Sequence, residues 1–166
     1  MRNIYLIGFM GCGKTSVATY LERVHGMPRI EMDRDIEADC GKTVSRIFAE
    51  DGEEFFRDKE TLLLKKIADK EEIVVSCGGG VPLRKENVEV MKSSGKIVYL
   101  KASPETILSH VSRSDKRPLL EGKKNVEEIG RMMSVRVPVY EASADAVIVT
   151  DGKSVAEVAE EVRSLN

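Results

Sequence analysis

Long apolar runs, a surplus of one charge and paired cysteines are all missing from this chain of 166 residues. Its apolar runs end after about five residues, whereas a membrane-spanning helix needs roughly 20. Lysine and arginine together number 26 against 28 aspartates and glutamates, so the net charge is only −2. Because no basic stripe stands out either, the composition gives no support to a membrane or nucleic-acid partner.

The sequence also has few cysteines and no linker segments. The three cysteines, Cys12, Cys40 and Cys77, form no Cys-x-x-Cys pair, which favours free thiols in a reducing cytosol over disulfides or a zinc site. The first three residues lead directly into an apolar run, so we expect no signal peptide and a cytoplasmic protein. Repeats, low-complexity tracts and linkers are absent from the sequence, which predicts one domain over residues 1–166.

The most informative stretch runs from Gly8 to Thr15 and fits the Gly-x-x-x-x-Gly-Lys-[Ser/Thr] pattern of a phosphate-binding loop. An apolar run at 3–7 predicts a buried strand before it, and apolar residues at helical spacing predict a helix from Lys14 onward. In this order of elements, Lys14 reaches the β- and γ-phosphates of a nucleotide and the Thr15 hydroxyl ligates Mg²⁺. The expected nucleotide contacts are Gly11, Cys12, Gly13, Lys14, Thr15 and Ser16. The alternative is a strand-to-helix turn that holds three glycines by chance.

Five apolar runs alternate with helical patterns along the whole chain. The predicted strands are 3–7, 29–32, 73–77, 97–100 and 146–149. Predicted helices begin near residues 14, 43, 53, 85, 103, 125 and 154, and the one that begins at Asn125 should stop near Pro138. This alternation predicts an α/β domain with a five-stranded parallel sheet flanked by helices on both faces. Such sheets bind ligands at the carboxyl ends of their strands.

Two groups of residues follow predicted strands at that edge of the sheet. Glu31 and Asp33 lie two apart at the end of the second strand, which would place both carboxylates on one face near the phosphate loop. They suit Mg²⁺ binding or proton transfer from a substrate hydroxyl, although solvated loop acids are the plainer interpretation. Gly78, Gly79 and Gly80 follow the third strand, which indicates either a close approach of the backbone to another group or a flexible turn.

Three further motifs occur later in the chain: Phe55-Phe56-Arg57 with Glu60, Arg117-Pro118-Leu119-Leu120, and Arg136 with Pro138 and Tyr140. The three arginines are too scattered for the sequence to link, and each alone reads as a surface charge. In this order and spacing, however, the full set of motifs resembles shikimate kinase over essentially the whole chain. The resemblance implies a P-loop kinase fold and ATP-dependent phosphorylation of shikimate to shikimate 3-phosphate, on the route to the aromatic amino acids.

The resemblance also implies roles for individual residues. Arg57 and Arg136 would hold the substrate carboxylate, because a guanidinium pairs bidentately with a carboxylate, and Asp33 would meet the hydroxyl that is phosphorylated. Helices at about 33–60 would bind the substrate, with Phe48 and Phe56 as walls. The complete implied substrate set is Asp33, Arg57, Gly78, Gly79, Gly80 and Arg136.

A mobile lid at about 112–124 is implied as well, and it would bring Arg117 to the transferring phosphoryl group. The implied catalytic set is therefore Lys14, Asp33 and Arg117, in a monomer that uses ATP, shikimate and Mg²⁺. Two positions depart from the family pattern. Glu31 stands where a second Asp is usual, which affects the metal site formed with Thr15. His110 stands where an Arg usually stacks on adenine, and a His ring can stack without the permanent charge.

Two rival functions remain at the level of sequence. A metabolite kinase of the same architecture, such as a gluconate or nucleoside-monophosphate kinase, would share the phosphate loop, but a neutral sugar would not need paired arginines. A nucleotide-binding regulator without turnover would not need Lys14, Asp33 and Arg117 together. Measuring ADP release with shikimate, gluconate and nucleoside monophosphates as acceptors distinguishes a shikimate kinase from these two rival functions.

Overall fold

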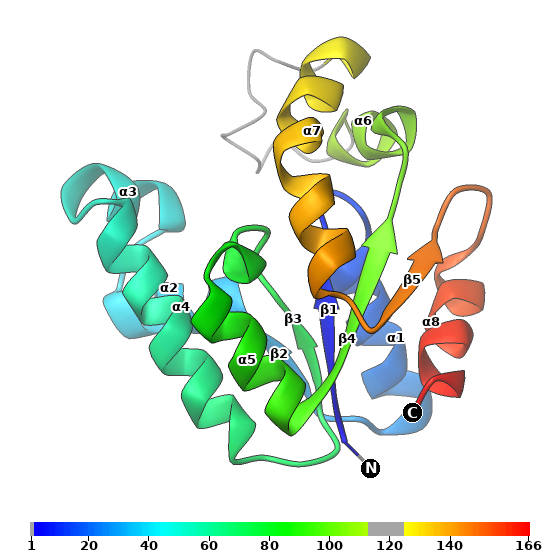
Figure 1. The fold of residues 1–166 in the computed structure, drawn as a ribbon, viewed down its shortest axis with the longest axis horizontal. Helices are drawn as coiled ribbons and strands as arrows, with labels where there is room; N and C mark the ends of the chain where they lie inside the picture. Colours follow the sequence, from blue (N-terminus) through cyan, green and yellow to red (C-terminus); the bar gives the residue numbers. More distant parts are fainter. Residues whose placement is uncertain (1, 113–124) are drawn as a thin grey trace.

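Five parallel strands form the centre of the protein, and helices cover both faces of their sheet (Figure 1). This computed structural model describes residues 2–112 and 125–166. The order across the sheet is β2-β3-β1-β4-β5, with the bounds β1 Asn3–Ile7, β2 Arg29–Glu31, β3 Val74–Ser76, β4 Gly95–Lys101 and β5 Ala146–Val149. The predicted α/β class, the five strands and their parallel pairing are confirmed.

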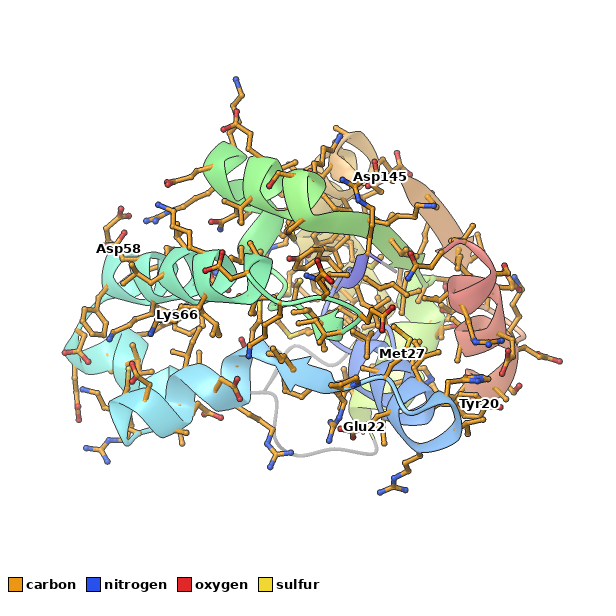
Figure 2. All side chains as sticks on the ribbon, turned by 90° about the horizontal axis from the view of Figure 1, so that it is seen from below. Tyr20, Glu22, Met27, Asp58, Lys66 and Asp145 are labelled. Atoms are coloured by element: carbon orange, nitrogen blue, oxygen red, sulfur yellow. The ribbon has the colours of Figure 1, made fainter. Side chains whose placement is uncertain are left out.

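The helices divide between the two faces of the sheet. Helix α1 (Lys14–His25) packs against α8 (Val155–Ser164), while α5 (Lys85–Ser94) and α7 (Val126–Ser143) contact β4 from the other face. Seen from below, α5 in green and α1 in blue lie on opposite sides of the strands (Figure 2). The remaining elements are α2 Met32–Cys40, α3 Val44–Glu50, α4 Glu53–Ala68, the 3₁₀ turn η1 Val81–Leu83 and α6 Pro104–Ser112.

Two apolar clusters hold these elements together. The larger one surrounds β1, whose residues are all buried, as expected for a central strand with both faces covered. A smaller cluster of Ile36, Ile47 and Phe56 joins α2, α3 and α4 beside the sheet. Within the described ranges, no helix has both the length and the apolar character needed to cross a bilayer.

The strand register brings two loops together at the carboxyl edge of the sheet. Leu6 of β1 aligns with Ser76 of β3 on one side and with Val98 of β4 on the other. Residues 8–13 and 77–80, which follow β1 and β3, therefore leave the same edge next to each other. This edge is where ligands of open α/β sheets bind.

The sequence predicts that the helix from Asn125 stops near Pro138, and this prediction is wrong. Helix α7 continues through Pro138 to Ser143. A proline inside a helix removes one backbone hydrogen bond and crowds the preceding turn. Met133 lies before the proline and Tyr140 after it, and both are buried, so packing on each side of Pro138 holds the helix together.

The prediction that the second strand extends through Met32 to Asp33 is also wrong, because α2 begins at Met32. Met32 and Ile36 are buried at helical spacing, and Asp33 and Asp35 lie in the first turn of α2. Carboxylates are favourable there because they face the positive end of the helix dipole. Glu31 and Asp33 therefore do not share one face of a strand.

Candidate active site

The phosphate loop connects the buried strand β1 to α1, as its sequence pattern requires. Gly13 precedes the helix with φ of 102°, a left-handed conformation that other residues rarely adopt. A Cβ on Gly8 would lie 2.7 Å from the carbonyl oxygen of Leu100, so the loop also needs glycine for space. The first turn of α1 contains no acidic residue. Its N–H groups and partial positive charge are thus suited to an anion.

Lys14 is the first residue of α1, and its side chain bends back across the loop. Its Nζ donates to the carbonyl oxygen of Gly8 at 2.7 Å and to that of Phe9 at 3.2 Å. Both contacts are to backbone carbonyls, and no carboxylate within residues 2–112 or 125–166 pairs with this cation. Cys12 is buried in the same loop, with its Sγ 3.8 Å from the Nζ of Lys14.

Thr15 and Glu31 meet beside the phosphate loop. The hydroxyl of Thr15 donates to Oε2 of Glu31 at 3.1 Å, while Oε1 of Glu31 accepts from Nη1 of Arg29 at 3.3 Å. No group of three or more His, Cys, Asp or Glu side chains suited to a metal occurs in the described ranges. Mg²⁺ commonly takes only one or two protein ligands and completes its shell with phosphates and water. The pair Thr15 and Glu31 fits that kind of site.

The three consecutive glycines after β3 are enclosed by charged side chains. A Cβ on Gly78 would lie 2.9 Å from Oδ1 of Asp33 and 2.8 Å from Oε2 of Glu60. A Cβ on Gly79 would lie 2.9 Å from Nη1 of Arg136, and one on Gly80 would clash with the guanidinium of Arg57. The glycines are therefore required for close approach.

This enclosure brings together residues from four separate parts of the chain. Asp33 comes from α2, Arg57 from α4 and Arg136 from α7, and all three reach the loop that follows β3. The structure thus brings together the residues that the family resemblance implies for the substrate.

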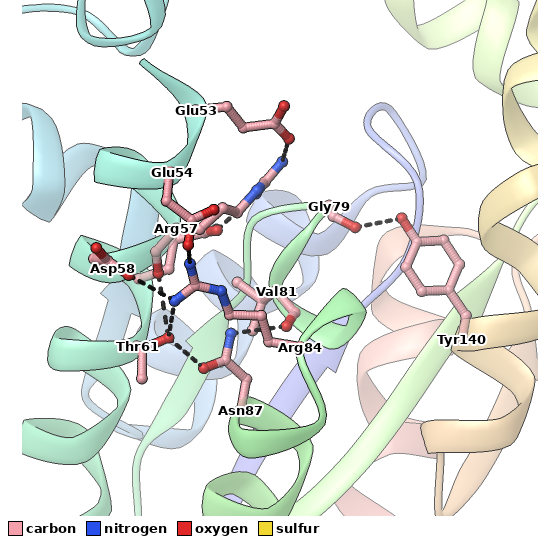
Figure 3. A network of polar contacts seen from close by, with 11 residues as sticks. Glu53, Glu54, Arg57, Asp58, Thr61, Gly79, Val81, Arg84, Asn87 and Tyr140 are labelled. Carbon is pink, nitrogen blue, oxygen red and sulfur yellow. Dashed lines mark hydrogen bonds and ion pairs between the residues drawn. The ribbon is translucent and has the colours of Figure 1, made fainter. Parts of the chain in front are cut away.

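Arg57 is held from several sides at once, and Figure 3 shows it between the glycine loop and α4. Its Nη1 donates to Oε1 of Glu60 at 2.6 Å and its Nη2 to Oε1 of Glu53 at 3.3 Å. The rings of Phe48 and Phe56 lie 5.9 and 5.5 Å from its Cζ, within the range of cation–π attraction. The Arg57 side chain is only 12% exposed and is held in place before any ligand binds.

Glu60 is a member of this site that the sequence analysis left without a role. Its side chain is fully buried, and burial raises its carboxyl pKa to about 7, an effect that Arg57 partly offsets. Its sequence signals were its place in the motif with Phe55-Phe56-Arg57 and its position three residues after Arg57, on the same face of α4. In the structure it lies behind Arg57 and beside Gly78.

The remaining predicted residues lie near the phosphate loop or outside the described ranges. His110 of α6 places Nδ1 2.6 Å from the carbonyl oxygen of Gly11, which can only accept, so this nitrogen carries the proton. Ser16 is exposed in the first turn of α1. Arg117 falls outside residues 2–112 and 125–166, as does the predicted lid at 112–124 apart from Ser112 at the end of α6.

Comparison with known proteins gives one consistent answer. A family model described as shikimate kinase matches residues 10–165. The shikimate kinase of Persephonella marina is 40% identical, over 98% of this chain and 97% of its own. That of Moorella thermoacetica is 41% identical, over 97% of this chain and 92% of its own.

Solved structures agree with these sequence matches. A shikimate kinase from Acinetobacter baumannii in complex with shikimate has a TM-score of 0.90 and 32% identity, covering 99% of this chain and 92% of that one. The Aquifex aeolicus shikimate kinase has a TM-score of 0.82 and 34% identity, covering 98% and 94%. A gluconokinase from Sinorhizobium meliloti, at 16% identity and a TM-score of 0.57, shares the fold alone.

Proposed function

Because the chain belongs to the shikimate kinase family and is a phosphotransferase with ATP as donor, we propose that the residues around its glycine loop bind and phosphorylate shikimate. The observation that carries the proposal is the convergence of Arg57, Arg136 and Asp33 on Gly78–Gly80, next to the phosphate loop. Two cations and a carboxylate match an acceptor that has both a carboxylate and a hydroxyl. The product is shikimate 3-phosphate, an intermediate on the route to aromatic amino acids.

The phosphate loop binds ATP in this proposal. Backbone N–H groups at the start of α1, together with Ser16, surround the phosphates. The Nζ of Lys14 exchanges its carbonyl partners for phosphate oxygens and stabilises the charge that develops during transfer. His110 lies where it can contact the base or the loop, and Arg117 is proposed as a second cation at the transferring group.

Thr15 and Glu31 are proposed to hold Mg²⁺, which when bound neutralises charge on the phosphates. The Thr15 hydroxyl has lone pairs left to ligate an ion while its O–H continues to donate to Glu31. The other carboxylate oxygen of Glu31 already accepts a hydrogen bond from Arg29. Glu31 is therefore better suited to accept a hydrogen bond from a metal-bound water than to ligate the ion directly.

Replacing Glu31 tests this arrangement. Glu31→Gln should need more free Mg²⁺ to reach its maximum rate, because it loses the negative charge next to the ion, whereas Glu31→Asp should be nearly neutral. The measurement is activity against free Mg²⁺ at fixed ATP. Arg29→Gln is the matched control, since it breaks the same ion pair but keeps the carboxylate. If the Glu31→Gln curve coincides with that of the parent, Glu31 has no part in the metal site.

The acceptor is proposed to bind through its carboxylate to Arg57 and Arg136 and through its hydroxyl to Asp33, between helices at about 33–60 and the glycine loop. Arg57 is already oriented by Glu60, Glu53 and two aromatic rings. Such pre-organisation lowers the entropy lost on binding.

Lysine substitutions at these arginines keep the charge and remove the planar fork. Arg57→Lys and Arg136→Lys should each raise the KM for shikimate about 10- to 100-fold, the effect of losing one charge-assisted hydrogen bond, and leave the KM for ATP nearly unchanged. Arg84→Lys is the control, because Arg84 pairs with Glu54 and Asp58 of α4 but does not contact the glycines. An equal rise in the KM for shikimate and the KM for ATP would show that these arginines do not bind the acceptor carboxylate specifically.

One assay tests the proposal as a whole. ADP release with ATP and Mg²⁺ is measured with shikimate, gluconate and nucleoside monophosphates as acceptors. Shikimate should be the preferred acceptor by kcat/KM, and preference for either alternative would overturn the assignment. A cytoplasmic location, which the three free cysteines support, and a monomeric state complete the proposal.

A further inference from the structure

The carbonyl groups of the three glycines are all occupied, but in two different ways. The carbonyl of Gly78 accepts from the N–H of Val81 and that of Gly80 from the N–H of Leu83, both at 3.1 Å. The carbonyl of Gly79 instead accepts from the hydroxyl of Tyr140 at 2.6 Å. The turn thus fixes two of its carbonyls through its own backbone. A side chain of α7 fixes the third, as Figure 3 shows.

The hydrogen bond from Tyr140 also sets the direction of an N–H group. The carbonyl of Gly79 and the N–H of Gly80 belong to one peptide unit, and the described residues contain no cis peptide bond. In a trans peptide the two groups point in opposite directions. Because the carbonyl faces Tyr140, the N–H of Gly80 faces away from α7. Arg57 lies on that side, across Gly79 from Tyr140 (Figure 3), and a Cβ on Gly80 would clash with its guanidinium.

A peptide unit between two glycines needs such a restraint. Without a Cβ on either side, few steric barriers oppose rotation of the unit, so a single hydrogen bond decides its orientation. No hydrogen bond among the described residues uses the N–H of Gly80, which leaves that donor for a ligand. The unit is therefore held from its carbonyl side only, by Tyr140.

Tyr140 is well suited to hold this orientation permanently. Its side chain is completely buried, and its ring packs on that of Tyr99 with the centroids 5.2 Å apart. Burial raises the pKa of its hydroxyl to about 12, so the group remains a protonated donor at neutral pH. The same hydroxyl lies beside Arg136, since a Cβ on Gly79 would be 3.5 Å from it and 2.9 Å from Nη1 of Arg136.

We propose that Tyr140 is a positioning residue for the acceptor: its hydroxyl orients the Gly79–Gly80 peptide so that the N–H of Gly80 donates to the acceptor carboxylate beside Arg57. The identity of the acceptor rests on the proposed function. Tyr140 itself does not touch substrate in this arrangement, and it acts on affinity rather than on the chemical step.

The test replaces the hydroxyl and keeps the ring. Tyr140→Phe should weaken shikimate binding, measured by calorimetry, about 2- to 10-fold, the worth of one hydrogen bond, with kcat and the KM for ATP within about twofold of the parent. Tyr99→Phe is the matched control, because Tyr99 is the other member of the same ring pair. Its buried hydroxyl has no hydrogen-bond partner in the described part of the chain. Its affinity for shikimate should equal that of the parent.

A spectroscopic measurement separates this inference from the proposed function. In protein labelled with ¹⁵N-glycine, the Gly80 amide signal of Tyr140→Phe should shift or broaden without any substrate, and that of Tyr99→Phe should not. An unchanged Gly80 signal, or equal losses of affinity in both variants, would overturn the role of Tyr140. Failure of the parent to bind shikimate would overturn the proposed function instead, while a changed Gly80 signal would still support the restraint by Tyr140.

Discussion

Lys14→Ala should lower kcat about 100- to 1,000-fold, the typical loss when one pre-organised charge is removed from a developing oxyanion. The structure gives the physical reason, because the Nζ of Lys14 is held over the phosphate loop by two backbone carbonyls and by no carboxylate of the described part of the chain. Its full charge is therefore available to the phosphoryl group. The measurement is ADP release at saturating ATP, Mg²⁺ and shikimate.

Two controls accompany Lys14→Ala. Lys42→Ala removes a lysine that pairs with Glu50 and Asp51 at the surface, so its kcat should remain near that of the parent. The melting temperature of Lys14→Ala shows whether the loop still folds, because the variant also loses the two contacts across the loop. Near-parental turnover by a folded Lys14→Ala protein would remove the basis for the phosphate-loop assignment.

Asp33→Asn should lower kcat about 100- to 10,000-fold, the range expected when a general base is lost. Asparagine keeps the shape and the ability to accept hydrogen bonds, but it cannot take a proton from the acceptor hydroxyl. Asp33 lies in the first turn of α2 with Oδ1 directed at Gly78, so it reaches the acceptor site from the helix rather than from a strand.

Two neighbouring carboxylates serve as comparisons for Asp33→Asn. Asp35→Asn changes an exposed residue of the same first turn, and its kcat should stay near that of the parent. Glu60→Gln weakens the support behind Arg57 and should mainly raise the KM for shikimate. If Asp33→Asn changes KM alone while Glu60→Gln lowers kcat, the proton acceptor is Glu60 and the assignment to Asp33 is wrong.

The fold followed from the sequence because its strongest signals are local. The phosphate loop lies between a continuous apolar strand and an amphipathic helix, and the glycines after β3 mark a close approach that the structure shows to be crowded by side chains. The errors arose where long-range packing overrides a local preference. Pro138 is a helix breaker, yet Tyr140 beyond it is anchored on Gly79 and Tyr99.

The candidate site was harder to predict than the fold, since its charges come from distant parts of the chain. Arg57 and Arg136 were linked through a family pattern, because no spacing rule connects α4 with α7. Glu60 and Tyr140 belonged to the same motifs but received no role. Both side chains are buried, and Glu60 accepts from Arg57 while Tyr140 donates to Gly79. Neither the burial nor these partners can be deduced from local sequence patterns.

The strand order has a consequence for the chain while it is being synthesised. β1 comprises residues 3–7, but its two neighbours in the sheet, β3 and β4, begin at residues 74 and 95. At about 5–20 residues per second, a ribosome needs roughly 5–20 s to supply both partners. Until β3 has been made, the most central strand of the finished protein has no partner for either edge, and its other edge still waits for β4. The N-terminal strand therefore cannot pair as soon as it is made, and it gains partners on both edges only after more than half of the protein has been synthesised.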